Sequence, residues 1–177
     1  YIETVDWTVD EIEEALVVAS ELKASRKSGQ PHRLLPDKTL YMLFLDKSTR
    51  TRNAFETGMT QLGGHAIYLA PSDIQLGARE SIPDVARNLE RWVDAIMART
   101  FRHDTITQLA EYCRVPVINA LSDYSHPCQA LADFQTLREA VGDLRAVRLA
   151  YVGDGNNVCH SLLFAAAKCG AGLPVAT

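Results

Sequence analysis

Residues 39–57 read TLYMLFLDKSTRTRNAFET, and they are the clearest indication of the fold class. Its first part, residues 39–45, is a short apolar run rich in residues that favour strands. Its last part, Asn53-Ala54-Phe55-Glu56-Thr57, is compatible with a helix. The turn between them, Ser48-Thr49-Arg50-Thr51-Arg52, is dense in hydroxyl and guanidinium groups. The stretch therefore predicts a strand, a polar turn and a helix in direct succession.

The same alternation of short apolar runs and longer helical stretches continues along the chain. Strands are predicted at residues 39–45, 65–69, 95–98, 115–119, 147–152 and 174–176, and helices near 51–62, 84–92, 105–112, 127–141 and 157–169. An amphipathic helix precedes them, from Thr8 to about Lys27, with Thr8 as its N-cap ahead of Glu11. Several strands are apolar throughout, as strands buried on both faces are. We therefore predict the α/β class, with a largely parallel sheet flanked by helices.

A weaker break in the pattern lies at Val141-Gly142-Asp143, after a long predicted helix and before an apolar strand. We therefore expect one domain over residues 1–142 and the beginning of a second α/β domain over residues 143–177. The second part holds one strand, one helix and the start of another strand, which is too little to close a core of its own. The chain is accordingly expected to be truncated within that domain.

Composition excludes several classes of protein. Of the 177 residues, 47% are apolar and 23% charged, which argues against a disordered or fibrous chain. The net charge of −4 offers no basic field for a nucleic acid or an anionic membrane. The four cysteines have no CxxC spacing, which favours reduced, packed thiols over a disulfide frame or a zinc site. Because no apolar run reaches the length of a membrane span and no leader pattern is present, we expect a cytoplasmic location.

The chemistry should lie where loops leave the carboxyl ends of the parallel strands. The turn Ser48-Thr49-Arg50-Thr51-Arg52 is a natural phosphate site, because helix N-terminal amides, hydroxyl donors and arginine charge converge there. Helix capping alone explains a serine or threonine at this point, but two arginines at the positive end of a helix are unfavourable unless an anion is present. Arg99 leaves the third strand at the same edge. His126-Pro127-Cys128-Gln129 opens the long helix after the fourth strand, with Pro127 suited to the first helical position.

This combination resembles the aspartate/ornithine carbamoyltransferase family. The family carries the STRTR turn and an HPxQ motif followed by LxD, which correspond here to Ser48 to Arg52, to His126 to Gln129 and to Leu131-Ala132-Asp133. Either motif alone is weak, and together they are a strong signal. The resemblance implies a carbamoyl-phosphate-binding domain, and transfer of a carbamoyl group from carbamoyl phosphate to an amine without metal or organic cofactor.

The resemblance also implies roles for individual residues. Ser48, Thr49, Arg50 and Thr51 would bind the phosphate, and Arg99 would touch both phosphate and carbonyl oxygen. His126 and Gln129 would hold the carbamoyl end. Arg50, Arg99 and His126 are therefore the expected catalytic residues.

The acceptor amine is predicted from two further positions. Gln75 lies in the loop after the second strand, which in the family's trimers reaches into a neighbouring active site and carries a lysine in aspartate enzymes. Gln75 resembles the ornithine branch instead, and Asn157, after Asp154-Gly155-Asn156, matches the residue that binds the acceptor's amino-acid end. One departure is that ornithine enzymes usually have a lysine two places before STRTR, where this chain has Asp46.

The expected activity is thus conversion of L-ornithine to L-citrulline in arginine metabolism by a cytoplasmic homotrimer or larger homo-oligomer, with this fragment alone weakly active or inactive. Three alternatives remain open. The acceptor could be aspartate, putrescine, N-acetylornithine or a ureido compound. The chain could be a non-catalytic fragment that binds carbamoyl phosphate. The GxG at Gly153 and Gly155 could be a dinucleotide turn, although it lacks the third glycine and the downstream acid of that motif.

Overall fold

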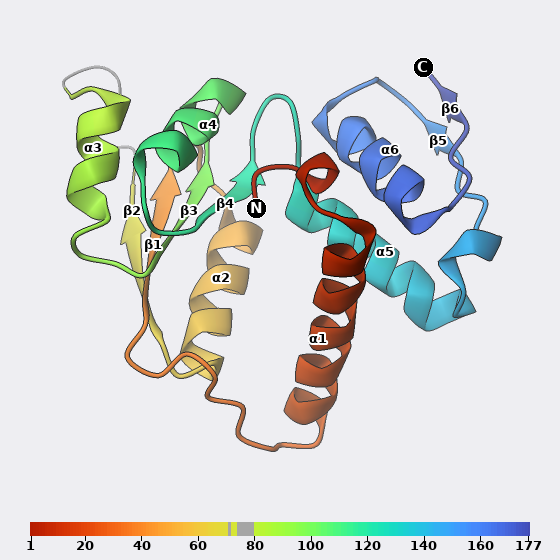
Figure 1. The fold of residues 1–177 in the computed structure, drawn as a ribbon, viewed down its shortest axis with the longest axis horizontal. Coiled ribbons are helices and arrows are strands. Elements are labelled where there is room, and N and C mark those ends of the chain that lie inside the picture. The colour runs from red at the N-terminus through yellow and green to blue at the C-terminus, as the bar shows by residue number, and fades with distance from the viewer. Residues whose placement is uncertain (71, 74–79) are drawn as a thin grey trace. The chain divides into compact units, whose positions relative to one another are not determined.

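The computed structural model describes residues 1–70, 72–73 and 80–177 and divides them into two compact units (Figure 1). We call Ile2 with Pro31–Ser122 the sheet unit, and Tyr1 with Glu3–Gln30 and Asp123–Thr177 the helical unit. The predicted boundary after residue 142 differs from this division and stays a prediction. Within the described ranges, no helix combines the length and apolar character needed to cross a membrane.

The sheet unit is built on four parallel strands in the order β2-β1-β3-β4. The strands are β1 (Thr39–Phe44), β2 (His65–Leu69), β3 (Ala95–Arg99) and β4 (Val117–Leu121), and the helices are α2 (Thr49–Gln61), α3 (Ile82–Leu89) and α4 (His103–Tyr112). Each strand pair runs in the same direction, so all four carboxyl ends lie at one edge. This confirms the predicted parallel sheet flanked by helices.

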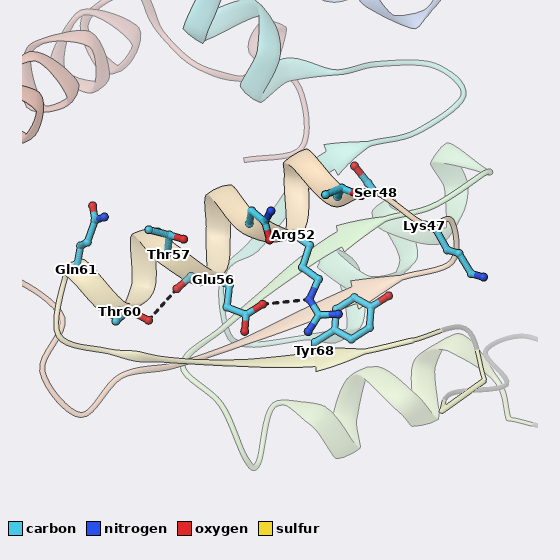
Figure 2. Close-up of a pocket in the computed structure, with 10 residues that line it drawn as sticks. Lys47, Ser48, Arg52, Glu56, Thr57, Thr60, Gln61 and Tyr68 are labelled. Atoms are coloured by element: carbon cyan, nitrogen blue, oxygen red, sulfur yellow. Dashed lines mark hydrogen bonds and ion pairs between the residues drawn. The ribbon is translucent and has the colours of Figure 1, made fainter.

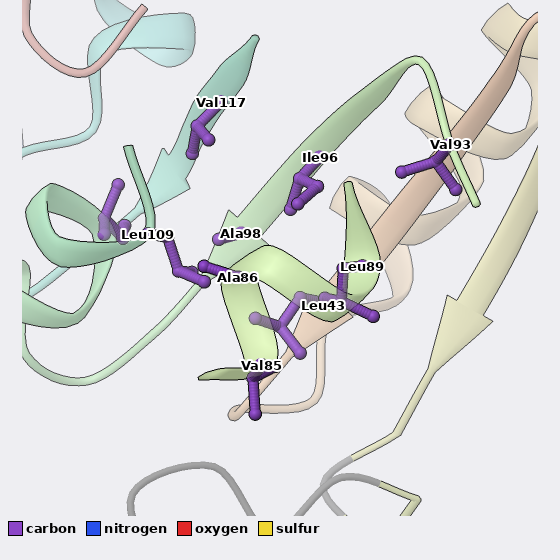
Figure 3. Close-up of a cluster of buried hydrophobic side chains, with 10 residues drawn as sticks. Leu43, Val85, Ala86, Leu89, Val93, Ile96, Ala98, Leu109 and Val117 are labelled. Carbon is purple, nitrogen blue, oxygen red and sulfur yellow. The ribbon is translucent and has the colours of Figure 1, made fainter. Parts of the chain in front are cut away.

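Alternate strand residues pack against different helices, which is why the strands are apolar on both faces. Leu43, Ile96 and Ala98 pack with residues of α3 and α4 (Figure 3). Their neighbours Met42 and Met97 belong to a second cluster, which includes Met59 of α2. The sheet is thus covered on one face by α3 and α4 and on the other by α2. Burial of both faces holds the strand ends at fixed positions.

The helical unit has a core of its own. Its elements are η1 (Thr4–Asp6), α1 (Val9–Lys27), α5 (Pro127–Val141), η2 (Leu144–Ala146), β5 (Tyr151–Val152), α6 (Asn157–Cys169) and β6 (Val175–Ala176). Ile12 and Leu16 of α1 pack with Phe134 of α5 and Ala165 of α6. The predicted capping box of α1 is present, since the Thr8 and Glu11 side chains each bond to the other's backbone N–H.

Some predicted boundaries were wrong for local reasons. Strand β4 begins at Val117 rather than at residue 115, because Pro116 has no N–H for the ladder and contributes only its carbonyl, which accepts from the Ile96 N–H at 2.9 Å. The strand predicted at 147–152 is reduced to Tyr151–Val152, with Arg148 bridging to Gly172 separately. Helix α3 starts two residues early because the Ser81 side chain caps it by accepting from the Asp84 N–H.

Candidate functional site

The turn between β1 and α2 forms the N-terminus of α2. Ser48 is the N-cap, and its hydroxyl accepts from the Thr51 N–H at 3.4 Å and donates to Thr51 Oγ1 at 3.0 Å. Thr49, Arg50 and Thr51 form the first turn, in which no acidic residue is present. In the described part of the chain, the exposed Arg50 guanidinium has no hydrogen-bond or ion-pair partner. Free amides, hydroxyls and a free cation at a helix N-terminus can bind an anion.

Arg99 lies beside this turn at the carboxyl end of β3. It is in register with Phe44 at the end of β1, and its carbonyl accepts from the Leu45 N–H at 2.9 Å. Its side chain is 16% exposed, and its Nη2 lies 3.5 Å from Asp46 Oδ2. The Arg99 Nε is buried with no hydrogen-bond partner among the described residues. The structure therefore brings Arg99 together with the predicted phosphate turn, with its guanidinium mostly buried and its Nη2 beside Asp46.

A cleft of about 750 Å³ extends from this turn along α2 (Figure 2). Lys47, Ser48 and Thr49 line one end of it, and Tyr68 of β2 lines its side. Arg52, the second arginine of the turn, lies over the Tyr68 ring at 4.0 Å from its centroid and pairs with Glu56 at 3.1 Å. The two arginines thus differ, because Arg52 contacts Glu56 and Tyr68, whereas Arg50 contacts no partner in the described ranges.

The HPxQ segment lies in the helical unit at the start of α5. His126 is the N-cap and Pro127 follows it within the first turn, as predicted. The His126 N–H donates to Ser161 Oγ at 2.8 Å, and that hydroxyl donates to the Asn157 carbonyl at 3.1 Å. The Gln129 side chain donates to Asp133 Oδ1 at 2.9 Å. Buried Ser161 therefore links the His126 turn to the first turn of α6.

Asn157, the predicted acceptor residue, is the first residue of α6. It follows a tight turn in which Gly153 has φ of +148°, a conformation that other residues rarely adopt. The Asn156 side chain caps α6 by accepting from the N–H groups of Val158 and Cys159, at 3.0 and 3.2 Å. The GxG of this segment is thus part of a capped strand-to-helix turn.

Cys128 lies inside the HPxQ segment but is no nucleophile at neutral pH. Burial raises the pKa of its thiol to about 11, so the thiol stays protonated. None of the four cysteines, all of them in described ranges, forms a disulfide bond. Within the ranges that the structure describes, no group of three or more His, Cys, Asp or Glu side chains could hold a metal ion.

The predicted site residues fall into two sets. Ser48, Thr49, Arg50, Thr51 and Arg99 lie together in the sheet unit, whereas His126, Gln129 and Asn157 belong to the helical unit. Gln75 lies outside the described residues. Sequence reasoning did not identify Ser161 as the partner of His126, nor Asp46 as the partner of Arg99. A serine four residues after Asn157 is compatible with a bond to the Asn157 carbonyl, but its contact with His126 has no signal in the sequence.

Comparison with known proteins agrees with these motifs. Residues 1–139 match the family described as aspartate/ornithine carbamoyltransferase, carbamoyl-P binding domain. The ornithine carbamoyltransferase of Pyrococcus horikoshii is 55% identical over 172 residues, which cover 97% of this chain and 54% of that protein. The solved ornithine carbamoyltransferase of Pyrococcus furiosus has a TM-score of 0.97 at 53% identity, covering 98% of this chain and 56% of that one. The solved ornithine carbamoyltransferase of Thermus thermophilus has a TM-score of 0.92 at 45% identity, covering 98% of this chain and 60% of that one. This chain spans about half the length of the curated relatives that it matches.

Proposed function

Because the chain belongs to the aspartate/ornithine carbamoyltransferase family, we propose that it supplies the carbamoyl-phosphate-binding side of an ornithine carbamoyltransferase. The proposed reaction transfers the carbamoyl group of carbamoyl phosphate to the side-chain amine of L-ornithine and yields L-citrulline and phosphate, as a cytoplasmic step of arginine metabolism. The observation that carries the proposal is the N-terminus of α2, where Arg50 has no partner among the described residues and Arg99 ends the neighbouring strand.

The phosphate group of the substrate binds in the first turn of α2. The amides of Thr49 and Arg50 and the hydroxyls of Thr49 and Thr51 donate hydrogen bonds to its oxygens, and Arg50 supplies a full positive charge. The Ser48 hydroxyl can donate as well once it turns away from Thr51 Oγ1. A phosphate held this way needs no metal to neutralise it, because the helix dipole and the arginine already favour a dianion. The same contacts stabilise the phosphate as the leaving group.

The carbamoyl end is the reacting end. Attack of the neutral amine on the carbonyl carbon builds negative charge on the carbonyl oxygen, so donors from Arg99 and His126 at that oxygen lower the barrier. Gln129 contributes to holding the carbamoyl group. The mechanism uses no nucleophilic side chain and no cofactor, and its rate comes from positioning and fixed donors.

The acceptor binds through other residues. Asn157 binds the amino-acid end of ornithine through its side-chain amide. In a homotrimer, Gln75 of a neighbouring subunit completes the carbamoyl phosphate site. Both assignments rest on the positions that these residues share with the family.

The test of this proposal is calorimetric titration of the full-length protein with carbamoyl phosphate, comparing Arg50→Ala with Arg52→Ala. The two variants remove the same charge from the same helical turn, but Arg52 pairs with Glu56 and lies over Tyr68, whereas Arg50 has no partner within the ranges that the structure describes. We expect Arg50→Ala to weaken binding at least tenfold and Arg52→Ala to change it much less, at both low and high salt. Equal binding by wild type and Arg50→Ala would refute the assignment. Equal losses in both variants that disappear at high salt would indicate diffuse attraction only.

A further inference from the structure

Tyr151 of β5 contacts the turn that precedes α6. Its hydroxyl donates to the Asp154 carbonyl at 2.8 Å, and the same hydroxyl lies 3.3 Å from Asn156 Oδ1. The Asp154 carbonyl also accepts from the Asn156 N–H at 2.8 Å. A tyrosine hydroxyl has one proton, so it donates mainly to the nearer Asp154 carbonyl and more weakly to Asn156 Oδ1. Tyr151 therefore holds both the carbonyl at the centre of the turn and the side chain that caps the helix.

The backbone of Tyr151 is itself fixed. Its N–H donates to the Pro174 carbonyl at 3.0 Å, and the Gly153 N–H donates to the Ala176 carbonyl at 3.0 Å. These bonds attach both sides of the tyrosine to the segment that contains β6. The ring lies against Gly153, because a Cβ built on that glycine would meet ring atoms at 3.8 Å. The hydroxyl thus acts from an anchored ring and not from a mobile side chain.

This arrangement fixes the position of Asn157. Asn156 Oδ1 accepts from the Val158 and Cys159 N–H groups, so its position defines where α6 begins. Asn157 is the first residue of that helix. A shift of the turn from residue 153 to residue 156 would displace Asn157 directly, while the phosphate turn belongs to the other compact unit.

We propose that Tyr151 is a positioning residue for the acceptor, which holds Asn157 in the orientation that binds the amino-acid end of ornithine. This inference rests on the proposed function, since it deepens the role assigned to Asn157. It makes Tyr151 a determinant of acceptor affinity that does not itself touch carbamoyl phosphate.

The test is the steady-state kinetics of full-length Tyr151→Phe, with Tyr112→Phe as the matched control. Phenylalanine keeps the ring and removes only the hydroxyl, and the Tyr112 hydroxyl has no hydrogen bond among the described residues. Loss of a hydrogen bond of ordinary strength predicts an ornithine KM raised about 3- to 10-fold in Tyr151→Phe. The KM for carbamoyl phosphate should stay within about twofold of wild type, and Tyr112→Phe should change neither. An unchanged ornithine KM, or equal rises in both KM values, would overturn the inference.

Two further measurements separate this inference from the proposed function. Asn157→Ala should raise the ornithine KM more than Tyr151→Phe does. If Asn157→Ala has no effect, the acceptor assignment fails and the role of Tyr151 fails with it. If Asn157→Ala has the expected effect and Tyr151→Phe has none, only the role of Tyr151 fails. Amide hydrogen exchange at Val158 and Cys159 should be faster in Tyr151→Phe, and unchanged exchange would show that the hydroxyl does not hold the cap.

Discussion

Asp46 lies within reach of Arg99, and replacing it by asparagine should strengthen binding of the substrate phosphate. The carboxylate is 3.5 Å from Arg99 Nη2, and its side chain is 44% exposed. An ion pair this exposed is worth roughly 0–1 kcal/mol. A phosphate that binds the same guanidinium must displace Asp46, and loss of that ion pair reduces the binding free energy by at most that amount. Because 1.36 kcal/mol corresponds to a tenfold change in affinity, Asp46→Asn should bind phosphate up to about fivefold more tightly.

The assay is calorimetric titration of full-length wild type and Asp46→Asn with carbamoyl phosphate at low and moderate salt. Asp94→Asn is the matched control, because Asp94 pairs with Lys38 at the opposite end of β3 and its loss changes the net charge equally. The gain should be confined to Asp46→Asn and should shrink as salt screens the charges. Weaker binding in Asp46→Asn would contradict this prediction, because it would mean that Asp46 holds Arg99 in its binding orientation. An equal gain in carbamoyl phosphate affinity in Asp94→Asn would also contradict the prediction.

Three other predictions concern stability and reactivity. Three carboxyl groups have lowered pKa values because basic side chains donate hydrogen bonds to them: Lys38 to Asp94, Arg102 to Asp104 and Lys23 to Glu139. Their contribution to stability is complete above their pKa values in the unfolded chain, 3.8 to 4.5, and it is lost as pH falls through their lower pKa values in the folded protein. Urea unfolding should therefore show lower stability at pH 3 than at pH 6, and equal stability would contradict this. Phe134→Ala should destabilise the helical unit by about 3–5 kcal/mol in urea titrations, because Phe134 is fully buried; a cost below about 1 kcal/mol would show that the core adapts. Cys128, with its pKa raised to about 11, should react slowly with iodoacetamide at pH 8 in the native protein and faster in denaturant, as peptide mass spectrometry would show; rapid native alkylation would contradict the raised pKa.

Much of the fold could be predicted because it depends on local patterns. The apolar run from residue 39 to residue 45 indicated β1, and Thr8 followed by Glu11 indicated a capping box that is present. The start of β4 was misplaced because the prediction followed the apolar run and gave too little weight to Pro116, which cannot donate to a ladder. Local sequence therefore predicted the elements better than their ends.

The candidate site was predictable where its residues share one turn. Ser48 to Thr51 are adjacent in the sequence, and Arg99 follows a neighbouring parallel strand, so sheet topology alone brings them to one edge. The contacts of His126 with Ser161 and of Arg99 with Asp46 connect residues 35 and 53 positions apart. No periodicity in the sequence encodes such pairs, because they depend on how elements pack in three dimensions.

The most direct measurement is citrulline formation by the full-length protein from carbamoyl phosphate and L-ornithine, compared with aspartate, putrescine and N-acetylornithine as acceptors. We expect turnover with L-ornithine, strongly reduced in Arg99→Ala, and little product from the other amines. Turnover with a different amine would contradict the acceptor assignment. Binding of carbamoyl phosphate with no turnover on any amine would contradict the proposed transferase activity itself.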